Sequence, residues 1–177
     1  MWRAFFYDWR HHDSGTHDEQ FGWGLESVLR PRAFFPAPPI IDVPQDTPAD
    51  VFNQIKQSFE LFWSDFNSCA NRLRVSVEFL LDMLKIGRFG TDKKGKTIAL
   101  DLNGRIALFA KIEPDHADTL TALRMIGNLG SHGNEVSREA LLDAFEIYGE
   151  ALKDLCGNRK ARMAALRAKL ISSKGRY

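Results

Sequence analysis

The sequence has few of the features that mark specialised classes of protein. It contains two cysteines, Cys69 and Cys156, and no CxxC pair, which argues against a zinc ribbon and against a disulfide framework. No apolar run approaches the roughly 18 to 20 residues needed to cross a bilayer, and the N-terminal residues lack the continuous apolar stretch of a signal peptide. We therefore expect a cytoplasmic protein with no membrane contact and with reduced thiols.

Acidic residues are lacking at the C-terminal end. Residues 157–177 carry seven basic side chains and no acidic one, although the net charge of the whole chain is only +1. Such a run can neutralise the phosphates of a nucleic acid, and it is equally consistent with a solvated helix face and a loose terminus. The basic residues considered as nucleic-acid contacts are Arg159, Lys160, Arg162, Arg167 and Lys169.

Aromatic residues, glycine and proline are plentiful in residues 1–48, where no helical or strand period persists. The prolines disfavour helix, and the aromatics supply apolar surface that can hold the segment against a neighbouring domain. We expect an irregular extension, with room for a short strand or a helical turn. His11, His12 and His17 lie near acidic residues in this extension, but their spacing matches no established ligand geometry, so we expect no metal and no other cofactor.

Amphipathic segments follow, and they predict an all-α, antiparallel helical bundle over residues 49–156. Thr47 and Pro48 form a typical helix start, and the first helix is indicated by apolar residues at 51, 52, 55, 59, 62, 63 and 66. The second helix is expected to stop at Gly87, after an apolar stripe of Cys69, Leu73, Val77, Leu80, Leu81 and Leu84. Residues 88–97 are expected to form an exposed loop.

Two further helices are expected to start near Leu100 and near Pro114 or Asp115, and His116 is expected on a solvated surface. Ser137 is the expected cap of a helix over residues 138–156, whose buried stripe would comprise Leu141, Leu142, Phe145, Tyr148, Leu152 and Leu155. The basic residues 157–177 are expected to form a last helix that frays into a tail.

The stretch RMIGNLGSHGNE, residues 124–135, places three polar side chains four residues apart among three glycines. If a helix continues through it, Arg124, Asn128 and His132 face roughly the same way. Arginine offers a fork of donors for phosphate, asparagine can orient a neighbour, and histidine, with an unperturbed pKa of about 6.5, suits proton transfer near neutrality. The set matches metal-independent cleavage of RNA, in which the ribose 2′-hydroxyl attacks the adjacent phosphate.

The glycines also allow a structural interpretation of this stretch. In that interpretation Gly130 or Gly133 ends the helix, His132 binds the last carbonyl groups, and Arg124 pairs with a carboxylate such as Glu78. Arg74 and Glu78 lie four residues apart on the second helix. They form either a surface ion pair or a support in which Glu78 orients Arg124 or His132.

The order of these segments carries a family resemblance. A helix containing RVSVEFLL, with Arg74 and Glu78, is followed by a variable loop and then by LRMIGNLGSHGNEVSREALLDAFEIYGEAL. This order resembles the HEPN superfamily (higher eukaryotes and prokaryotes nucleotide-binding), and more narrowly it is similar to the bacterial branch known as domain-of-unknown-function family 4145. The resemblance covers roughly residues 38–156.

The resemblance implies a helical bundle that forms a homodimer, in a superfamily of metal-independent ribonucleases found in toxin–antitoxin, CRISPR-associated and other phage-defence systems. One implied function is an endoribonuclease with His132 as general acid and base, Asn128 as orienting group and Arg124 as phosphate clamp. Many members are non-catalytic, so the alternative is an inactive dimerisation module that binds nucleic acid, a nucleotide or a partner protein of a defence system. A third is a regulatory subunit whose aromatic extension docks on a larger effector.

The superfamily's catalytic pattern is an arginine, four to six residues, and then a histidine, usually with a polar residue directly after the arginine. Asn128 and His132 fit the polar and histidine places, but Gly127 stands in the arginine's place and Arg124 lies one helical turn earlier. A long guanidinium side chain at 124 can still reach a phosphate held by His132. The sequence therefore poses the question of whether Arg124 replaces the missing arginine.

Overall fold

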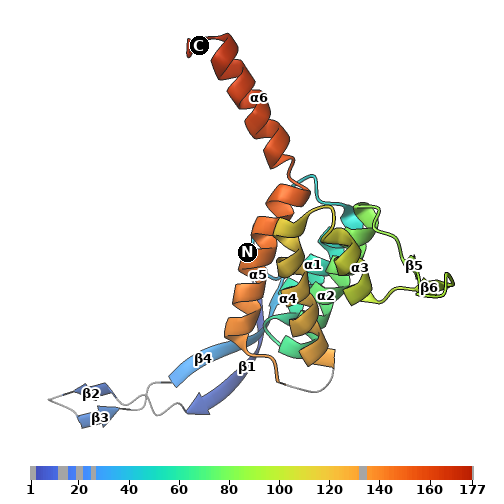
Figure 1. Cartoon of the computed structure of the whole chain (residues 1–177). Coiled ribbons are helices and arrows are strands. Elements are labelled where there is room, and N and C mark those ends of the chain that lie inside the picture. Colours follow the sequence, from blue (N-terminus) through green and yellow to red (C-terminus); the bar gives the residue numbers. More distant parts are fainter. Residues whose placement is uncertain (1–2, 12–15, 19–21, 25–26, 132–134, 177) are drawn as a thin grey trace.

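The computed structural model describes residues 3–11, 16–18, 22–24, 27–131 and 135–176, and the side chains of residues 33–131, 135–158 and 161–176. Helices dominate these residues: α1 (Ala49–Leu61), α2 (Phe66–Met83), α3 (Leu102–Phe109), α4 (Pro114–Ser131), α5 (Arg138–Leu155) and α6 (Arg159–Ser172). The first five form a bundle from which α6 projects (Figure 1). The predicted all-α helical bundle is confirmed. None of the described helices is both long enough and apolar enough to span a membrane.

The centre of the bundle is α2, which packs against α1 and α4 and also contacts α3 and α5. Its apolar stripe is buried as predicted, except that Leu84 is only partly covered. Burying a leucine or phenylalanine contributes about 1.5 to 3 kcal/mol. The core therefore holds α2 firmly, and any residue on α2 or α4 that faces their contact has a fixed position. The largest fully buried side chains include Tyr148, Phe145, Ile55, Leu73, Leu80 and Leu120.

Side-chain caps fix the starts of three helices. The Asp65 carboxylate accepts from the Ser68 N–H (3.0 Å) at the start of α2, and Ser137 Oγ accepts from the Ala140 N–H (3.1 Å) at the start of α5, as predicted. Asp101 caps α3 through the Gly104 N–H (2.7 Å). The predicted cap at Thr47 is wrong, because Thr47 is buried and α1 begins at Ala49, one residue after Pro48.

The segment between α2 and α3 also departs from expectation. The helix ends at Met83 and the reversal falls on Lys85, whose φ is 61°, so Gly87 is not the stop. Residues 88–97 are not a loop but mostly a hairpin of β5 (Phe89–Thr91) and β6 (Thr97–Ala99). The carboxylate of Asp92 closes the tip, since its Oδ1 accepts the N–H groups of Lys94 (2.8 Å) and Lys96 (2.9 Å).

The N-terminal extension contains two antiparallel strand pairs where irregular structure was expected. β1 (Arg3–His11) pairs with β4 (Ser27–Phe35), and β2 (Thr16–Asp18) pairs with β3 (Gly22–Gly24). Aromatic residues favour strands, and proline is tolerated in β4 because a two-stranded ribbon consists only of edges. At the end of β4 the Phe34 ring meets the Trp63 ring edge-on, with centroids 4.5 Å apart, so this ribbon contacts the bundle.

Candidate functional site

Most of the predicted site residues lie on one pair of packed helices, α2 and α4. These helices run antiparallel, because Gly127 faces Ala70 and Arg74 while Gly130 faces Asn67. A Cβ atom on residue 127 would lie 2.4 Å from Arg74 Cβ and 3.1 Å from the Ala70 carbonyl oxygen, and one on residue 130 would lie 2.5 Å from the Asn67 carbonyl oxygen. The two glycines therefore allow a close backbone approach. We call this contact the α2–α4 seam.

The helix α4 continues through both glycines and ends at Ser131, whose Oγ donates to the Gly127 carbonyl (2.9 Å). The interpretation in which Gly130 ends the helix is therefore wrong. Each glycine lowers helix stability by roughly 1 kcal/mol relative to alanine, and the close packing along the seam offsets this loss. Arg124 and Asn128 are both half-buried, and on a continuous helix they share a face. His132 and Gly133 lie outside the described residues, so their predicted roles stay predictions.

Arg74 passes directly over Gly127. Its Cβ and Cδ would lie 2.4 Å and 3.0 Å from a Cβ atom on residue 127, so the Arg74 stem occupies the space in which a side chain at 127 would begin. The predicted ion pair with Glu78 is present, at 3.3 Å between Arg74 Nη1 and Glu78 Oε1. Among the described residues Glu78 pairs with Arg74, and the alternative pair with Arg124 is not formed.

Two guanidinium donors on the seam have no acceptor in the described part of the chain. The Nε atoms of Arg74 and Arg124 are both buried and make no hydrogen bond. The antiparallel register places Arg124, one turn before Gly127, at the level of the α2 turn that carries Arg74 and Glu78. A buried donor without a partner costs about 1 to 3 kcal/mol. Two arginines and one glutamate leave a net positive charge, which suits an anion with several acceptor oxygens, such as a phosphate group.

The seam also fixes the chain beyond α4 through Asn67, a residue that the sequence did not single out. Its side-chain Oδ1 accepts the Val136 N–H (3.2 Å), and its backbone lies against Gly130. The Oδ1 atom of Asn71, one turn later on α2, lies 3.4 Å from Ser131 Oγ. α2 thereby holds both sides of the segment that contains His132. An asparagine at the exposed edge of a helical pattern gives no signal of such a role.

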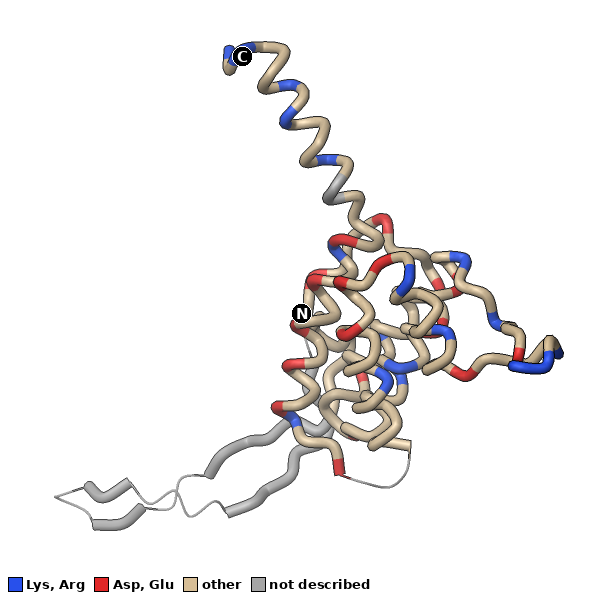
Figure 2. Tube along the Cα trace, viewed as in Figure 1, with Lys and Arg blue, Asp and Glu red and all other residues tan. Residues whose placement is uncertain are grey.

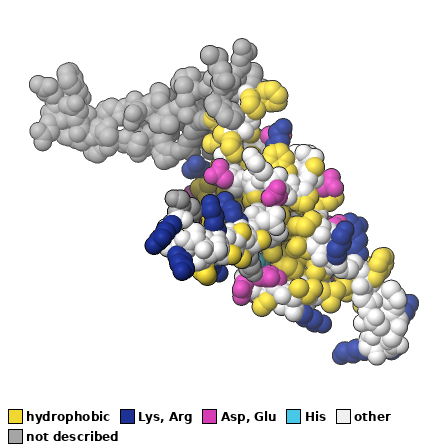
Figure 3. All heavy atoms as spheres, turned by 90° about the horizontal axis from the view of Figure 1, so that it is seen from above, with side chains coloured by type: hydrophobic (Ala, Val, Ile, Leu, Met, Phe, Trp, Pro, Cys, Tyr) yellow, Lys and Arg dark blue, Asp and Glu magenta, His cyan; other side chains and the backbone are white. Residues whose placement is uncertain are grey.

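The second set of predicted nucleic-acid contacts lies on α6, away from the seam. Arg162, Arg167 and Lys169 are exposed along this projecting helix, whereas the side chains of Arg159 and Lys160 lie outside those that the structure describes. Figure 2 shows the contrast in charge, with basic positions along α6 and acidic positions along α5. Viewed from the α6 end, basic side chains gather over α6 and at the distant β5–β6 hairpin (Figure 3). The seam and α6 are separate surfaces.

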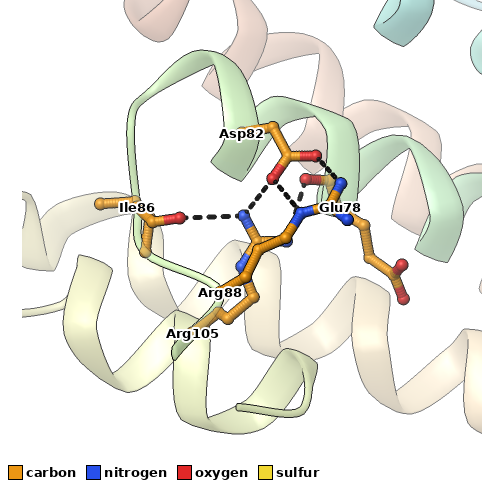
Figure 4. A network of polar contacts seen from close by, with 5 residues as sticks. All are labelled: Glu78, Asp82, Ile86, Arg88 and Arg105. Carbon is orange, nitrogen blue, oxygen red and sulfur yellow. Dashed lines mark hydrogen bonds and ion pairs between the residues drawn. The ribbon is translucent and has the colours of Figure 1, made fainter. Parts of the chain in front are cut away.

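A buried charge network at the end of α2 was not expected from the sequence. The Arg105 side chain is only 5% exposed, and its guanidinium donates to Asp82 Oδ1 (2.7 Å), to the Ile86 carbonyl (3.1 Å) and to the Glu78 carbonyl (3.3 Å) (Figure 4). Arg88 donates to both Asp82 carboxylate oxygens. These hydrogen bonds, that from Arg88 foremost, hold the pKa of Asp82 below its usual value. The network ties α3 and the hairpin to α2.

A signal for this network was present in the sequence. The buried apolar residues of α3 are Leu102, Ile106 and Phe109, and residue 105 falls among them at helical spacing. An arginine on a buried helix face requires acceptors, and the network supplies them for both Nη atoms of Arg105, while its Nε has none in the described part of the chain. Its role is to position the hairpin and α3.

His116 is a further correction. It was expected on a solvated surface, but its side chain is only 14% exposed and its Nε2 lies 3.6 Å from Asp154 Oδ2, so it joins α4 to α5. Among the described residues, histidine, cysteine, aspartate and glutamate form no group that could hold a metal. The side chains of His11, His12 and His17 fall outside that part of the chain.

Comparison with known proteins gives one finding. The model of a family described as a domain of unknown function, DUF4145, matches residues 56–171, which is more than half of the chain and includes every helix from the middle of α1 to the end of α6 but for its last residue. No curated protein and no solved structure matches the chain. With its helical bundle and its glycine-lined seam, the chain belongs to the DUF4145 family.

Proposed function

We propose that the chain is an RNA-binding, HEPN-like domain of a bacterial defence or toxin-type system, and that its α2–α4 seam holds a phosphate of the RNA. The observation that carries the proposal is the pair of buried Nε donors, on Arg74 and Arg124, which no described residue accepts. A phosphate group offers several acceptor oxygens and a charge opposite to that of the guanidinium pair. The resemblance of residues 124–135 to the HEPN motif is the reason for naming RNA as the source of the phosphate.

Arg74 is the residue best placed to supply the guanidinium group that the motif lacks at position 127. A side chain at position 127 would start where Arg74 Cβ and Cδ now lie, so Arg74 carries a guanidinium group from α2 into that neighbourhood. Glu78 fixes one of its Nη atoms, while Nε stays unsatisfied. Arg124, one turn earlier on α4, supplies the second cation.

RNA binding can be measured by fluorescence anisotropy of labelled single-stranded RNA over a range of salt concentrations. Arg74→Gln and Arg124→Gln keep the aliphatic stem and remove the charge, and each is expected to weaken binding and to lower the salt dependence by about 0.7 of a log unit per log unit of salt, the value for one phosphate contact on a single strand. Arg72→Gln is the matched control, because Arg72 is exposed on the same helix and, among the described residues, bonds to Gln54 alone. If all three variants bind alike, the seam does not hold phosphate.

Catalysis is a second candidate function, favoured by the continuity of α4 through Ser131, which keeps Arg124 and Asn128 on one face. Labelled tRNA and single-stranded RNA would be incubated with the protein in EDTA, beside His132→Ala and Asn128→Ala. A metal-independent ribonuclease should cleave in EDTA and should lose roughly 10² to 10⁴ in rate without its histidine. Equal inertness of wild type and variants, together with salt-sensitive binding, would identify the chain as the inactive binding module.

A further inference from the structure

The helix α6 exposes an apolar surface that the bundle does not cover. It contains 14 residues, so it is about 21 Å long, and among the described elements it contacts only α5. Leu166, Leu170 and Ile171 are 44%, 45% and 77% exposed, and Met163, Leu166 and Leu170 share one face. A lone helix of this length is marginal in water. An apolar stripe flanked by basic residues therefore indicates that something packs on α6.

A groove along α5 has the complementary character. It has a volume of about 340 Å³ and lies between α5 and residues 40–42. Its apolar lining includes Ile40, Ile41 and Leu142. Its charged lining comprises Asp42, Glu146, Glu150 and one cation, Lys153, which pairs with Glu150 at 2.6 Å, so three carboxylates face one ammonium group. Gly149 is buried at the floor of the groove, where the Ile41 side chain packs over it. The groove thus offers apolar contact with carboxylates beside it.

Four acidic residues of α5 form an exposed stripe that is about three quarters as long as α6. Glu139, Asp143, Glu146 and Glu150 are all exposed at spacings of four, three and four, so they lie on one face and span about 16 Å. The sequence predicted Leu142 in the buried stripe of this helix, yet it is 38% exposed beside these acids. An occupant of the groove would cover Leu142 and would restore the predicted burial.

We infer that the occupant is α6 of a second copy, so that two chains exchange their C-terminal helices and each α6 lies in the α5 groove of the other. Each chain carries two complementary surfaces, a basic helix with an apolar stripe and an acidic groove with an apolar lining. With a two-fold axis near the α5–α6 junction, α6 of each copy lies antiparallel to α5 of the other, and both grooves are filled at once. A phosphate-rich ligand explains the basic residues of α6 but not its exposed leucines, which favours a protein occupant.

The mass of the full chain in solution, measured by light scattering after size exclusion and without RNA, tests the exchange. The wild type should give about twice 20.1 kDa. Arg162→Glu/Arg167→Glu reverses the charge on α6, and Asp143→Lys/Glu146→Lys reverses the charge of the groove. Each double variant should weaken the dimer by roughly tenfold or more, because like charges then meet at the interface. An equimolar mixture of the two variants should dimerise again, because both interfaces of the mixed pair are then complementary. Lys93→Glu/Lys94→Glu, on the remote hairpin tip, is the control and should leave the dimer intact.

Three other results would overturn the inference. A wild-type monomer whose RNA binding is lost on Arg162→Glu/Arg167→Glu would make α6 a nucleic-acid contact. A disulfide between Leu142→Cys and Leu170→Cys that forms only within one chain would show α6 folded back on its own groove, whereas exchange gives a covalent dimer on a non-reducing gel. Leu166→Asp/Leu170→Asp, both on the exposed face, is the second variant should a charge reversal fail to fold. A dimer that none of these changes weakens would place the interface elsewhere.

Discussion

The replacement of Gly127 by alanine tests most directly why a glycine stands in the motif. Alanine is the better helix former, so in an open helix the change would stabilise α4 by roughly 1 kcal/mol. At position 127 the new Cβ would lie 2.4 Å from Arg74 Cβ and 3.1 Å from the Ala70 carbonyl oxygen. These atoms belong to the α2 backbone or are fixed to it, so α2 and α4 must move apart. Overpacking of this kind costs about 1 to 3 kcal/mol, so we expect a net loss of up to about 2 kcal/mol.

Gly130→Ala and Gly149→Ala complete the comparison. At position 130 the added Cβ meets the Asn67 carbonyl oxygen at 2.5 Å, which a side-chain movement cannot relieve, so this variant should also be destabilised. At position 149, also buried and inside a helix, the nearest atom is Ile41 Cδ1 at 3.5 Å, an ordinary contact. Gly149→Ala should therefore gain about 0.5 to 1 kcal/mol.

The measurement is the free energy of unfolding in urea, followed by far-ultraviolet circular dichroism. Arg74→Ala is combined with Gly127→Ala as a further arm. Because the closest atom is Arg74 Cβ, which alanine retains, shortening Arg74 should not rescue Gly127→Ala. If Gly127→Ala is as stable as the wild type, or if it gains as much as Gly149→Ala, the seam is not closely packed at 127 and the reasoning fails.

Three more predictions concern stability and reactivity. The pKa of Asp82 is lowered in the folded state from its ordinary value of 3.8, so its contribution to the free energy of unfolding is present above about pH 4 and is lost as the pH falls through the folded pKa. Asp82→Asn should therefore lower stability at neutral pH and should make stability depend less on acid. Urea titrations at several pH values measure both effects. Burial raises the pKa of the Cys69 thiol to about 12 and also raises that of Cys156, so Ellman's reagent should label both only after denaturation, and rapid native labelling would contradict their burial. Ser76 Oγ bonds to the Leu73 carbonyl (2.6 Å) and lies 3.0 Å from Tyr148 Oη. Tyr148→Phe should cost about 1 kcal/mol, and Ser76→Ala should cost more, because it leaves the buried tyrosine hydroxyl unpaired. Equal losses in thermal unfolding would argue against this pairing.

The helices could be predicted from the sequence because their signals are local. Ser137 followed by an apolar stripe starts α5, and Pro114 starts α4, both as expected. The failures came from positions decided by tertiary structure. Gly87 resembles a stop, but Lys85 takes the left-handed conformation instead, and the strand pairs of residues 3–35 depend on partners far apart in sequence.

The candidate site was predictable in its residues but not in its arrangement. The spacing of Arg124 and Asn128 on one helix face follows from helical geometry alone. The ion pair of Arg74 with Glu78 was likewise predicted from their spacing of four on one helix. That Arg74 crosses Gly127 depends on the register between α2 and α4, about which one sequence says nothing. Arg105 shows the opposite case, since its helical spacing from Leu102, Ile106 and Phe109 is enough by itself to mark it as buried.

The glycine in the arginine's place can now be given a physical reason. An arginine at 127 would need the space that Arg74 Cβ and Cδ fill, so the two residues exclude each other as long as α2 and α4 stay in contact. If Arg74 supplies the guanidinium group, as proposed, a motif sought along one helix overlooks a side chain that another helix contributes. The question posed by the sequence, whether Arg124 replaces the motif's arginine, becomes a comparison between two arginines. If the seam binds phosphate, Arg74→Gln should weaken binding at least as much as Arg124→Gln, and a larger loss on Arg124→Gln would return the role to α4.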